Sequence, residues 1–232
     1  MQCISPTLLR AYREAKFVVE DKIPITLLVG QSNQSLRALL KEHKVFTAAF
    51  ITAFNPHSNL LSIEENSKSQ NQILADIQRL GLNAIDGYGQ DIAGEWPKET
   101  SLLVLGITEA QAETLADRYY QNGFIWVGSA DALPVLRLRY PIALPTNIEL
   151  TNWISWLPAN LSSNAKLLSP IEQAWLMSVP AAEQFHWLDP TSWDLNKVWP
   201  MAKPDGSAMG IGTELDRVFK LIAAGQSQIV RT

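Results

Sequence analysis

Residues 46–54 read Phe-Thr-Ala-Ala-Phe-Ile-Thr-Ala-Phe, and Asn55-Pro56 follows them directly. A nearly continuous apolar run of this length predicts a strand that is buried on both faces, as the central strands of a sheet are. The run stops at Pro56 because proline cannot donate to the hydrogen-bond ladder of a central strand. We therefore expect a sheet with residues 46–54 near its middle.

Helices and further strands follow this segment along the chain. Ser62 with Glu65, and Thr108 with Gln111, have the spacing of a capping box, and each pair predicts the start of a helix. Four further apolar runs predict strands, the last of them at an edge of the sheet: residues 82–85, 101–107, 124–128 and 134–138. The first of these runs leads into Gly87-Tyr88-Gly89, which we expect to belong to a loop.

From residue 46 to residue 127 the predicted order is strand, helix, strand, strand, helix, strand. This is the order of a ferredoxin-like β-α-β-β-α-β sandwich, an α+β fold in which two helices cover one face of an antiparallel sheet. Residues 16–20 and 25–29 predict an N-terminal hairpin that extends the sheet. A short helix that begins at Ser5-Pro6 precedes the hairpin. We expect residues 1–140 to form this domain.

The sequence changes character after Tyr140, where strand patterns cease. Thr146 with Glu149 predicts the start of a helix, and Thr213 with Asp216 predicts the start of the last one. We expect residues 141–232 to form a helical extension that packs on the first domain, because so many apolar side chains would not stay in water. Its tryptophans could form its core or an aromatic binding surface; they are Trp153, Trp156, Trp175, Trp187, Trp193 and Trp199.

Composition restricts the classes of function. A net charge of −4 and a pI near 5.4 weigh against nucleic-acid binding and suit a basic protein partner. Cys3 is the single cysteine, and the three histidines are scattered, so we expect neither a metal nor another cofactor. Because we find no signal-peptide pattern and no apolar run of membrane-spanning length, we expect a cytoplasmic protein that does not bind membranes. The oligomeric state stays open.

Five motifs occur in order in the first domain. They are residues 50–56 with Ser58, Glu65-Asn66, Gly87-Tyr88-Gly89, Glu95-Trp96-Pro97 with Glu99, and Tyr120-Gln121-Asn122. With these motifs, about residues 8–138 resemble a bacterial family of unknown function, domain-of-unknown-function family 3293. The resemblance implies that the motif residues belong together, and it implies no activity. The extension resembles no family that we can name.

Polar side chains from these motifs converge at one end of the predicted sheet. Asn55 ends the central strand and Asn66 lies in the first turn of the next helix, so we expect their side chains to reach each other or the loop between them. The candidate ligand or partner residues are Asn55, Ser58, Asn66, Tyr88, Glu95, Trp96, Glu99 and Gln121. Alternatively, Asn55, Ser58 and Asn66 only satisfy backbone groups of a tight loop.

Two functions are open at this point. The first is a non-catalytic protein-binding module, for example a toxin-neutralising protein of the immunity type, because no catalytic set is evident and we assign no catalytic residue. The second is a small-molecule-binding protein or an enzyme, in which Glu95 and Glu99 could act as general acid and base. This second function would use a polar pocket near Asn55, Asn66, Tyr88, Glu95 and Trp96.

Overall fold

The structure is a computed structural model, and it describes residues 3–92, 96–128, 132–168, 170–179, 181–188, 201–202 and 208–209. The chain divides into two compact units. One unit is Glu14–Tyr140, and the other combines Met1–Arg13 with Pro141–Thr232. The first helix thus groups with the region after Tyr140.

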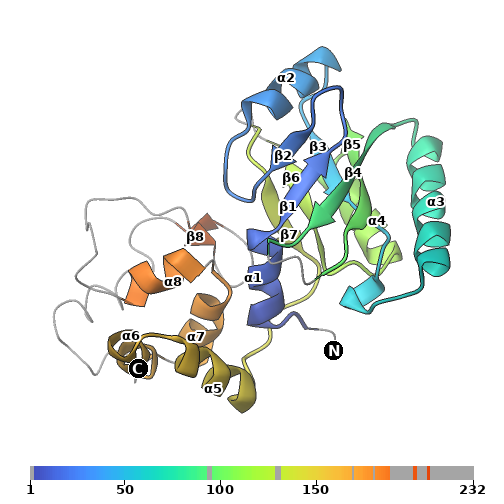
Figure 1. Cartoon of the computed structure of the whole chain (residues 1–232). Helices are drawn as coiled ribbons and strands as arrows, with labels where there is room; N and C mark the ends of the chain where they lie inside the picture. Colours follow the sequence, from blue (N-terminus) through green and yellow to red (C-terminus); the bar gives the residue numbers. More distant parts are fainter. Residues whose placement is uncertain are drawn as a thin grey trace. The chain divides into compact units, whose positions relative to one another are not determined.

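The unit Glu14–Tyr140 contains an antiparallel sheet with seven described strands in the order β2-β1-β4-β5-β3-β6-β7 (Figure 1). The strands are β1 (Lys16–Val19), β2 (Ile25–Leu27), β3 (Ala48–Ile51), β4 (Asn83–Gln90), β5 (Glu99–Leu105), β6 (Gly123–Val127) and β7 (Val135–Leu138). The predicted α+β class is confirmed. The hairpin β1–β2 extends the sheet through β4, and β7 is an edge strand, as predicted.

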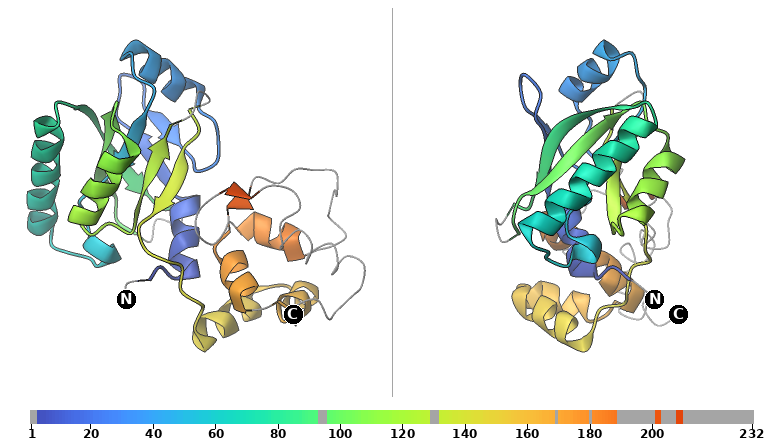
Figure 2. Two further views of the ribbon diagram at one scale, coloured as in Figure 1. Left: turned by 180° about the vertical axis from the view of Figure 1, so that it is seen from behind. Right: turned by 90° about the vertical axis from the view of Figure 1, so that its right-hand side faces the viewer.

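Two helices lie on one face of this sheet, α3 (Ile63–Arg79) and α4 (Glu109–Arg118), as Figure 2 shows. Both predicted capping boxes are present at their starts. The core below the helices combines side chains from β3, β5 and β6 with side chains from both helices, among them Ala49, Ile51, Ile73, Ile77, Leu102, Val104, Leu115 and Trp126. A third helix, α2 (Gln34–Glu42), contacts β2.

Asp76 links the last turns of α3 and α4. Its carboxylate accepts hydrogen bonds from Arg118 at 2.7 Å and from the Tyr119 hydroxyl at 2.8 Å, and it also pairs with Arg79. The Asp76 side chain is buried, and these partners lower its pKa, with the bond from Arg118 as the largest cause. No local sequence pattern predicts this cluster.

The central strand β3 is buried at all four positions, as expected, but it is shorter than the apolar run that predicted it. Phe46 is 87% exposed. The partner strand β5 ends at Leu105, and the chain turns at Gly106 with a φ of 72°. Phe46 therefore has no neighbouring strand to pack against, and the predicted range of residues 46–54 was too long.

The prediction for β4 was wrong in the opposite sense, because Gly87 and Gly89 lie inside this strand and not in a loop. A Cβ atom at residue 87 would lie 2.3 Å from the backbone oxygen of Val18 and 2.9 Å from the Phe50 ring. Glycine is required there because β1 approaches the backbone of β4 closely. The contact is distant in sequence, so the local pattern could not reveal it.

The edges of the sheet are short strands. β2 has three residues, and the carbonyl oxygen of Thr26 in its middle accepts a hydrogen bond from Asn33 Nδ2 at 2.8 Å. β7 has four residues, and its Arg137 pairs with Glu109 of α4.

The described part of the second unit is mainly helical. It contains α1 (Pro6–Glu14), α5 (Asn147–Trp156), α6 (Ala159–Ala165), α7 (Pro170–Met177), α8 (Ala181–Leu188) and a short pair of strands, β8 (Met201–Ala202) with β9 (Ala208–Met209). Thr146 and Glu149 form the predicted capping box of α5. The predicted helix after Thr213 lies outside the described residues. Packing of this unit on the other stays a prediction.

The tryptophans of this unit differ in exposure. Trp153 is buried, and its Nε1 donates to Gln184 Oε1 at 2.8 Å. Trp156 is 50% exposed, and its ring stacks on Phe185. Trp193 and Trp199 lie outside the described residues. No described helix is both long and apolar enough to span a bilayer.

Candidate functional site

Asn55 and Asn66 bind each other at the end of β3. The backbone N–H of Asn55 donates to Asn66 Oδ1 at 2.8 Å, and Asn66 Nδ2 donates to Asn55 Oδ1 at 2.9 Å. Each residue is only 4% exposed. The predicted contact between the two side chains is therefore present, and both amides are too deeply buried to meet a ligand in this conformation.

The same two amides fix the loop between them. Leu61 donates its backbone N–H to Asn55 Oδ1 at 3.0 Å and accepts from Asn66 Nδ2 at 3.3 Å. One turn further along α3, Gln70 Oε1 accepts from the backbone N–H of Ala53 at 2.9 Å. These bonds pair backbone groups that the end of the strand leaves without a ladder partner. They match the structural alternative that the sequence left open.

Glu99, the first residue of β5, joins this cluster as its one carboxyl group. Its Oε1 accepts from Asn55 Nδ2 at 2.6 Å and from Trp96 Nε1 at 2.8 Å. Burial raises the pKa of Glu99, while these two hydrogen bonds act in the opposite direction. No described cation forms an ion pair with it, so neutral donors hold a carboxyl group that can keep its proton at a higher pH than an ordinary glutamate.

The remaining candidate residues lie around this cluster or apart from it. Tyr88 lies in β4, and the Nζ of Lys98 stands 4.2 Å from the centre of its ring. Ser58 Oγ accepts from Asn122 Nδ2 at 3.0 Å. Gln121 Nε2 donates to the carbonyl oxygen of Phe54 at 2.9 Å and so ties the end of β3 to the segment after α4. Glu95 lies outside the described residues.

Backbone strain is concentrated in the loop after β3. Asn55, His57 and Ser58 have φ values of 46°, 54° and 59°, and Tyr120 opposite them has a φ of 53°. The His57 N–H donates to the Tyr120 carbonyl at 2.8 Å. The left-handed conformation costs a residue other than glycine about 1–2 kcal/mol. Such strain persists where the surrounding structure enforces it, and it is typical of functional sites.

Three apolar residues next to this loop point into solvent. Leu60 is 62% exposed, Ile63 is 84% exposed, and Leu61 between them is also exposed. We call Leu60, Leu61 and Ile63 the apolar segment. The apolar segment was not predicted, although the sequence contains a signal for it. An apolar residue before a helix cap usually packs on an apolar residue at the fourth helical position, which here is Asn66.

The described part of the chain offers no group of three or more His, Cys, Asp or Glu residues that could hold a metal ion. The donors in the cluster are two amides and one indole, and its single carboxyl group gives one oxygen to both Asn55 and Trp96. The chemistry that this arrangement supports is hydrogen bonding and proton exchange at Glu99.

Comparison with known protein families gives one match, over part of the chain. Residues 51–123 match the model of a family described as protein of unknown function (DUF3293). The matched segment runs from the end of β3 to the start of β6, so it contains the whole Asn55–Glu99 cluster and both covering helices. The predicted resemblance is confirmed over this segment. No curated protein and no solved structure matches the chain.

Proposed function

We propose that this chain is a non-catalytic protein-binding module, and that the apolar segment is the centre of its binding surface. The main support is an inversion of polarity at one end of the sheet. Leu60 and Ile63 are exposed to water, whereas Asn55 and Asn66, whose side chains bond the backbone of Leu61, are buried. Buried polar groups and exposed large apolar groups are the informative exceptions in a folded protein.

The buried amides hold the apolar segment in a defined shape. The backbone of Leu61 is bonded on both its N–H and its carbonyl side, and Ser62 is fixed by the capping box. A surface that is already ordered loses little conformational entropy when a partner binds. The strained backbone of the neighbouring loop supports the same proposal, since a purely structural turn could use glycine at lower cost.

The partner that fits this surface is a protein with an apolar contact centre and a basic rim. Glu64 and Glu65 follow directly in the first turn of α3, and both are exposed. Together with the net charge of −4, they favour a basic partner. A toxin-neutralising role of the immunity type, with a basic toxin as partner, is one concrete form of this proposal.

The proposal can be tested by site-specific photo-crosslinking in cells that express the protein from its own gene. One variant carries a photoreactive residue in place of Ile63. A control variant carries it in place of Ile23, which is 79% exposed in the turn of the hairpin. We expect one defined partner to crosslink at residue 63 and not at residue 23. Adding Leu60→Ser to the first protein should abolish the crosslink.

A partner that crosslinks equally at residues 23 and 63 would contradict the proposal. A crosslink at residue 63 that persists in the Leu60→Ser variant would also contradict it. Crosslinking of the chain to itself through residue 63 would mean that the partner is a second copy of this chain. The melting temperature of each variant serves as the control, because substitutions at exposed positions should leave the fold intact.

A small-molecule or enzymatic role of the same end of the sheet is the second candidate. It is favoured by Glu99, whose burial raises its pKa while no described cation pairs with it. Such carboxyl groups occur where an enzyme or a ligand needs a proton donor or acceptor near neutral pH. If this role holds, Glu99→Gln abolishes an activity that Leu60→Ser leaves intact, which is the reverse of the result expected for protein binding.

We also propose that the central part of the sheet is a ferredoxin-like sandwich. The support is the order β4-β5-β3-β6 of its four inner strands, all antiparallel, with α3 between β3 and β4 and α4 between β5 and β6. The hairpin β1–β2 and the strand β7 then count as additions at its two edges. An experimental structure in which α3 and α4 lie on opposite faces would contradict this.

A further inference from the structure

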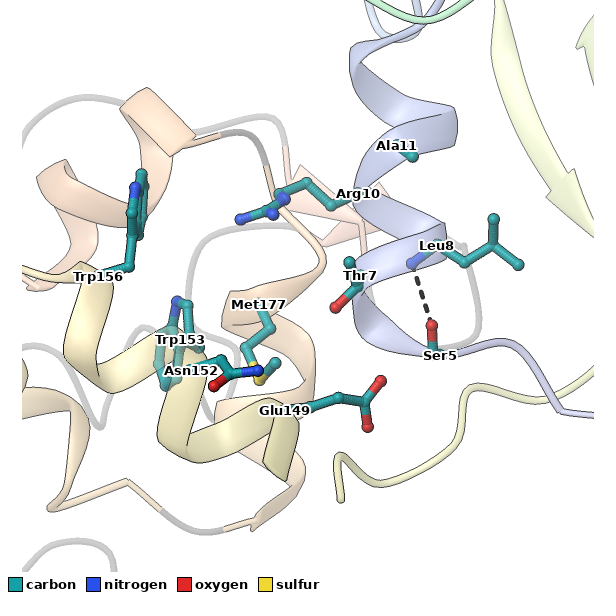
Figure 3. A pocket seen from close by; sticks show the side chains of 10 residues that line it. All are labelled: Ser5, Thr7, Leu8, Arg10, Ala11, Glu149, Asn152, Trp153, Trp156 and Met177. Atoms are coloured by element: carbon teal, nitrogen blue, oxygen red, sulfur yellow. Dashed lines mark hydrogen bonds between the residues drawn. The ribbon is translucent and has the colours of Figure 1, made fainter. Parts of the chain in front are cut away.

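The helical unit contains a cavity of about 620 Å³ between side chains of α1, α5 and α7 (Figure 3). This volume lies in the range of sites for small molecules. Five side chains determine its chemistry: Arg10, Glu149, Trp153, Trp156 and Met177. None of them belongs to the site at the end of the sheet, so the cavity needs an explanation of its own.

Arg10 supplies a positive charge that no described residue neutralises. The carbon atom of its guanidinium group stands 6.0 Å from the centre of the Trp156 ring, and among the described residues no carboxylate pairs with it. Figure 3 shows the side chain extending from α1 toward Trp156. A guanidinium group stacked near an indole keeps its forked N–H donors available, and these match a carboxylate or a similar planar anion.

The opposite wall is apolar and firmly held. The indole N–H of Trp153 is already bonded to Gln184, so Trp153 offers the cavity only its ring. Trp156 stacks on Phe185 with ring centres 5.1 Å apart and planes 18° apart. Met177 is buried beside them. Two fixed indoles and a thioether form a surface on which an aromatic ring can pack.

Glu149 determines the orientation of an anion in the cavity. Its Oε2 accepts hydrogen bonds from the backbone N–H and the hydroxyl of Thr146, each at 2.8 Å, so the carboxylate is fixed by the capping box of α5. A negative charge held at this position repels a second one. The acid group of a ligand is therefore directed away from Glu149 and toward Arg10.

We propose that this cavity binds a small organic anion with an aromatic body, whose acid group pairs with Arg10 and whose ring packs on Trp153 and Trp156. The site is independent of the apolar segment, because all of its residues lie in the other unit of the chain. The proposal therefore adds a small-molecule ligand to the proposed protein-binding role and does not depend on it.

The test uses the full-length protein and three indoles that differ in charge: indole-3-acetate, the neutral indole-3-acetamide and the cationic tryptamine. Binding is measured by saturation-transfer NMR with each compound at millimolar concentration. We expect saturable binding of the acetate, weaker binding of the acetamide and none of the tryptamine. Arg10→Gln should weaken binding of the acetate at least tenfold, whereas Arg37→Gln, an exposed position on α2 with the same change of charge, should leave it unchanged.

Equal binding of the acetate and the acetamide would overturn the proposal, and so would the lack of saturable binding of the acetate to the unmodified protein. An equal loss in both arginine variants would assign the effect to net charge and would also overturn it. If Arg10→Gln does not fold, the comparison of the three indoles on the unmodified protein still decides the question.

Discussion

A carboxyl group lies at each end of helix α3, the buried Asp76 and the half-buried Glu99, and the fold holds the two in opposite ways. At the C-terminal end, Asp76 is surrounded by Arg79, Arg118 and the Tyr119 hydroxyl, and its pKa is lowered. At the N-terminal end, Glu99 is held by an amide and an indole, and burial raises its pKa. Cations pair with the carboxylate at one end, and no described cation does so at the other.

The difference separates a structural site from a candidate functional one. Ion pairs with Arg118 and Arg79 make the charge of Asp76 favourable to the fold. Removing the Asp76 side chain would also leave the Tyr119 hydroxyl without its acceptor. No described cation gives the charge of Glu99 such a benefit to stability. Glu99 lies beside the strained loop and the exposed apolar segment. Stability alone explains neither the strain nor the exposure.

The contrast between Asp76 and Glu99 requires that Asp76 contributes strongly to stability. We expect Asp76→Ala to lower the free energy of unfolding by about 3 kcal/mol, because it removes the acceptor of a buried hydroxyl and one partner of two arginines. Urea denaturation at pH 7 measures this loss, with Glu42→Ala at an exposed position of α2 as the control. A loss no larger than that of the control would show that the cluster is not structural.

The same variant has a predictable pH dependence. The pKa of Asp76 is lowered in the folded protein, so its contribution is present above the unfolded pKa of about 3.9 and disappears as the pH falls through the folded pKa. The stability difference between the unmodified protein and Asp76→Ala should therefore shrink in acid. A difference that stays constant from pH 7 to pH 3 would contradict the ion-pair explanation.

A smaller effect is expected at the other end of the helix. Asn66→Ala removes the partners of the Asn55 N–H and the Leu61 carbonyl, and it should cost about 1–2 kcal/mol. Asn55→Ala should cost a similar amount, whereas Asn59→Ala, at an exposed neighbour, should cost almost nothing. Unchanged denaturation midpoints for Asn55→Ala and Asn66→Ala would mean that these amides serve a ligand and not the loop.

Glu99→Gln should change stability by less than about 1 kcal/mol, and in the favourable direction. The amide oxygen of glutamine can still accept from Asn55 and Trp96. Folding raises the pKa of Glu99, so the protonated carboxyl group stabilises the folded protein at low pH. This contribution is lost as the pH rises through the pKa of the folded state. The variant should thus be more stable than the unmodified protein at pH 8 and not at pH 4. The opposite pH dependence would indicate a cation partner.

The smallest effect on stability is expected at the apolar segment itself. Ile63→Ser replaces a side chain that is mostly in water, so the free energy of unfolding should stay within about 0.5 kcal/mol of its original value. A calorimetric comparison with Ile77→Ser, which changes a buried position of the same helix, provides the contrast. A large loss for Ile63→Ser would show that the segment packs against the protein and is not available to a partner.

Features that depend on a few neighbouring residues were predictable from the sequence. Ser62 with Glu65, and Thr108 with Gln111, marked the helix starts because a capping box requires only residues three apart. Pro56 marked where the chain has left the sheet, although β3 itself already ends at Ile51. The contact between Asn55 and Asn66 followed from these two boundaries, since the strand end and the helix start fix where both side chains lie.

Features that depend on distant contacts were not predictable. Gly87 lies in a strand because of Val18, which is far away in sequence, and Phe46 is exposed because β5 ends where it does. Asp76 could be recognised as a structural residue only once the end of α4 was known to lie beside it. That no described cation pairs with Glu99 likewise depends on residues distant in sequence, and a local pattern does not contain that information.

The short edges of the sheet also limit how another chain can approach. An incoming strand would meet three residues at β2, where the Thr26 carbonyl is already occupied, or four residues at β7, where Arg137 is tied to α4. Neither edge offers a long row of free N–H and carbonyl groups, so strand addition and growth into fibrils are both disfavoured. A partner of this sheet would therefore have to recognise it through side chains, and the short edges protect the sheet against edge-to-edge aggregation.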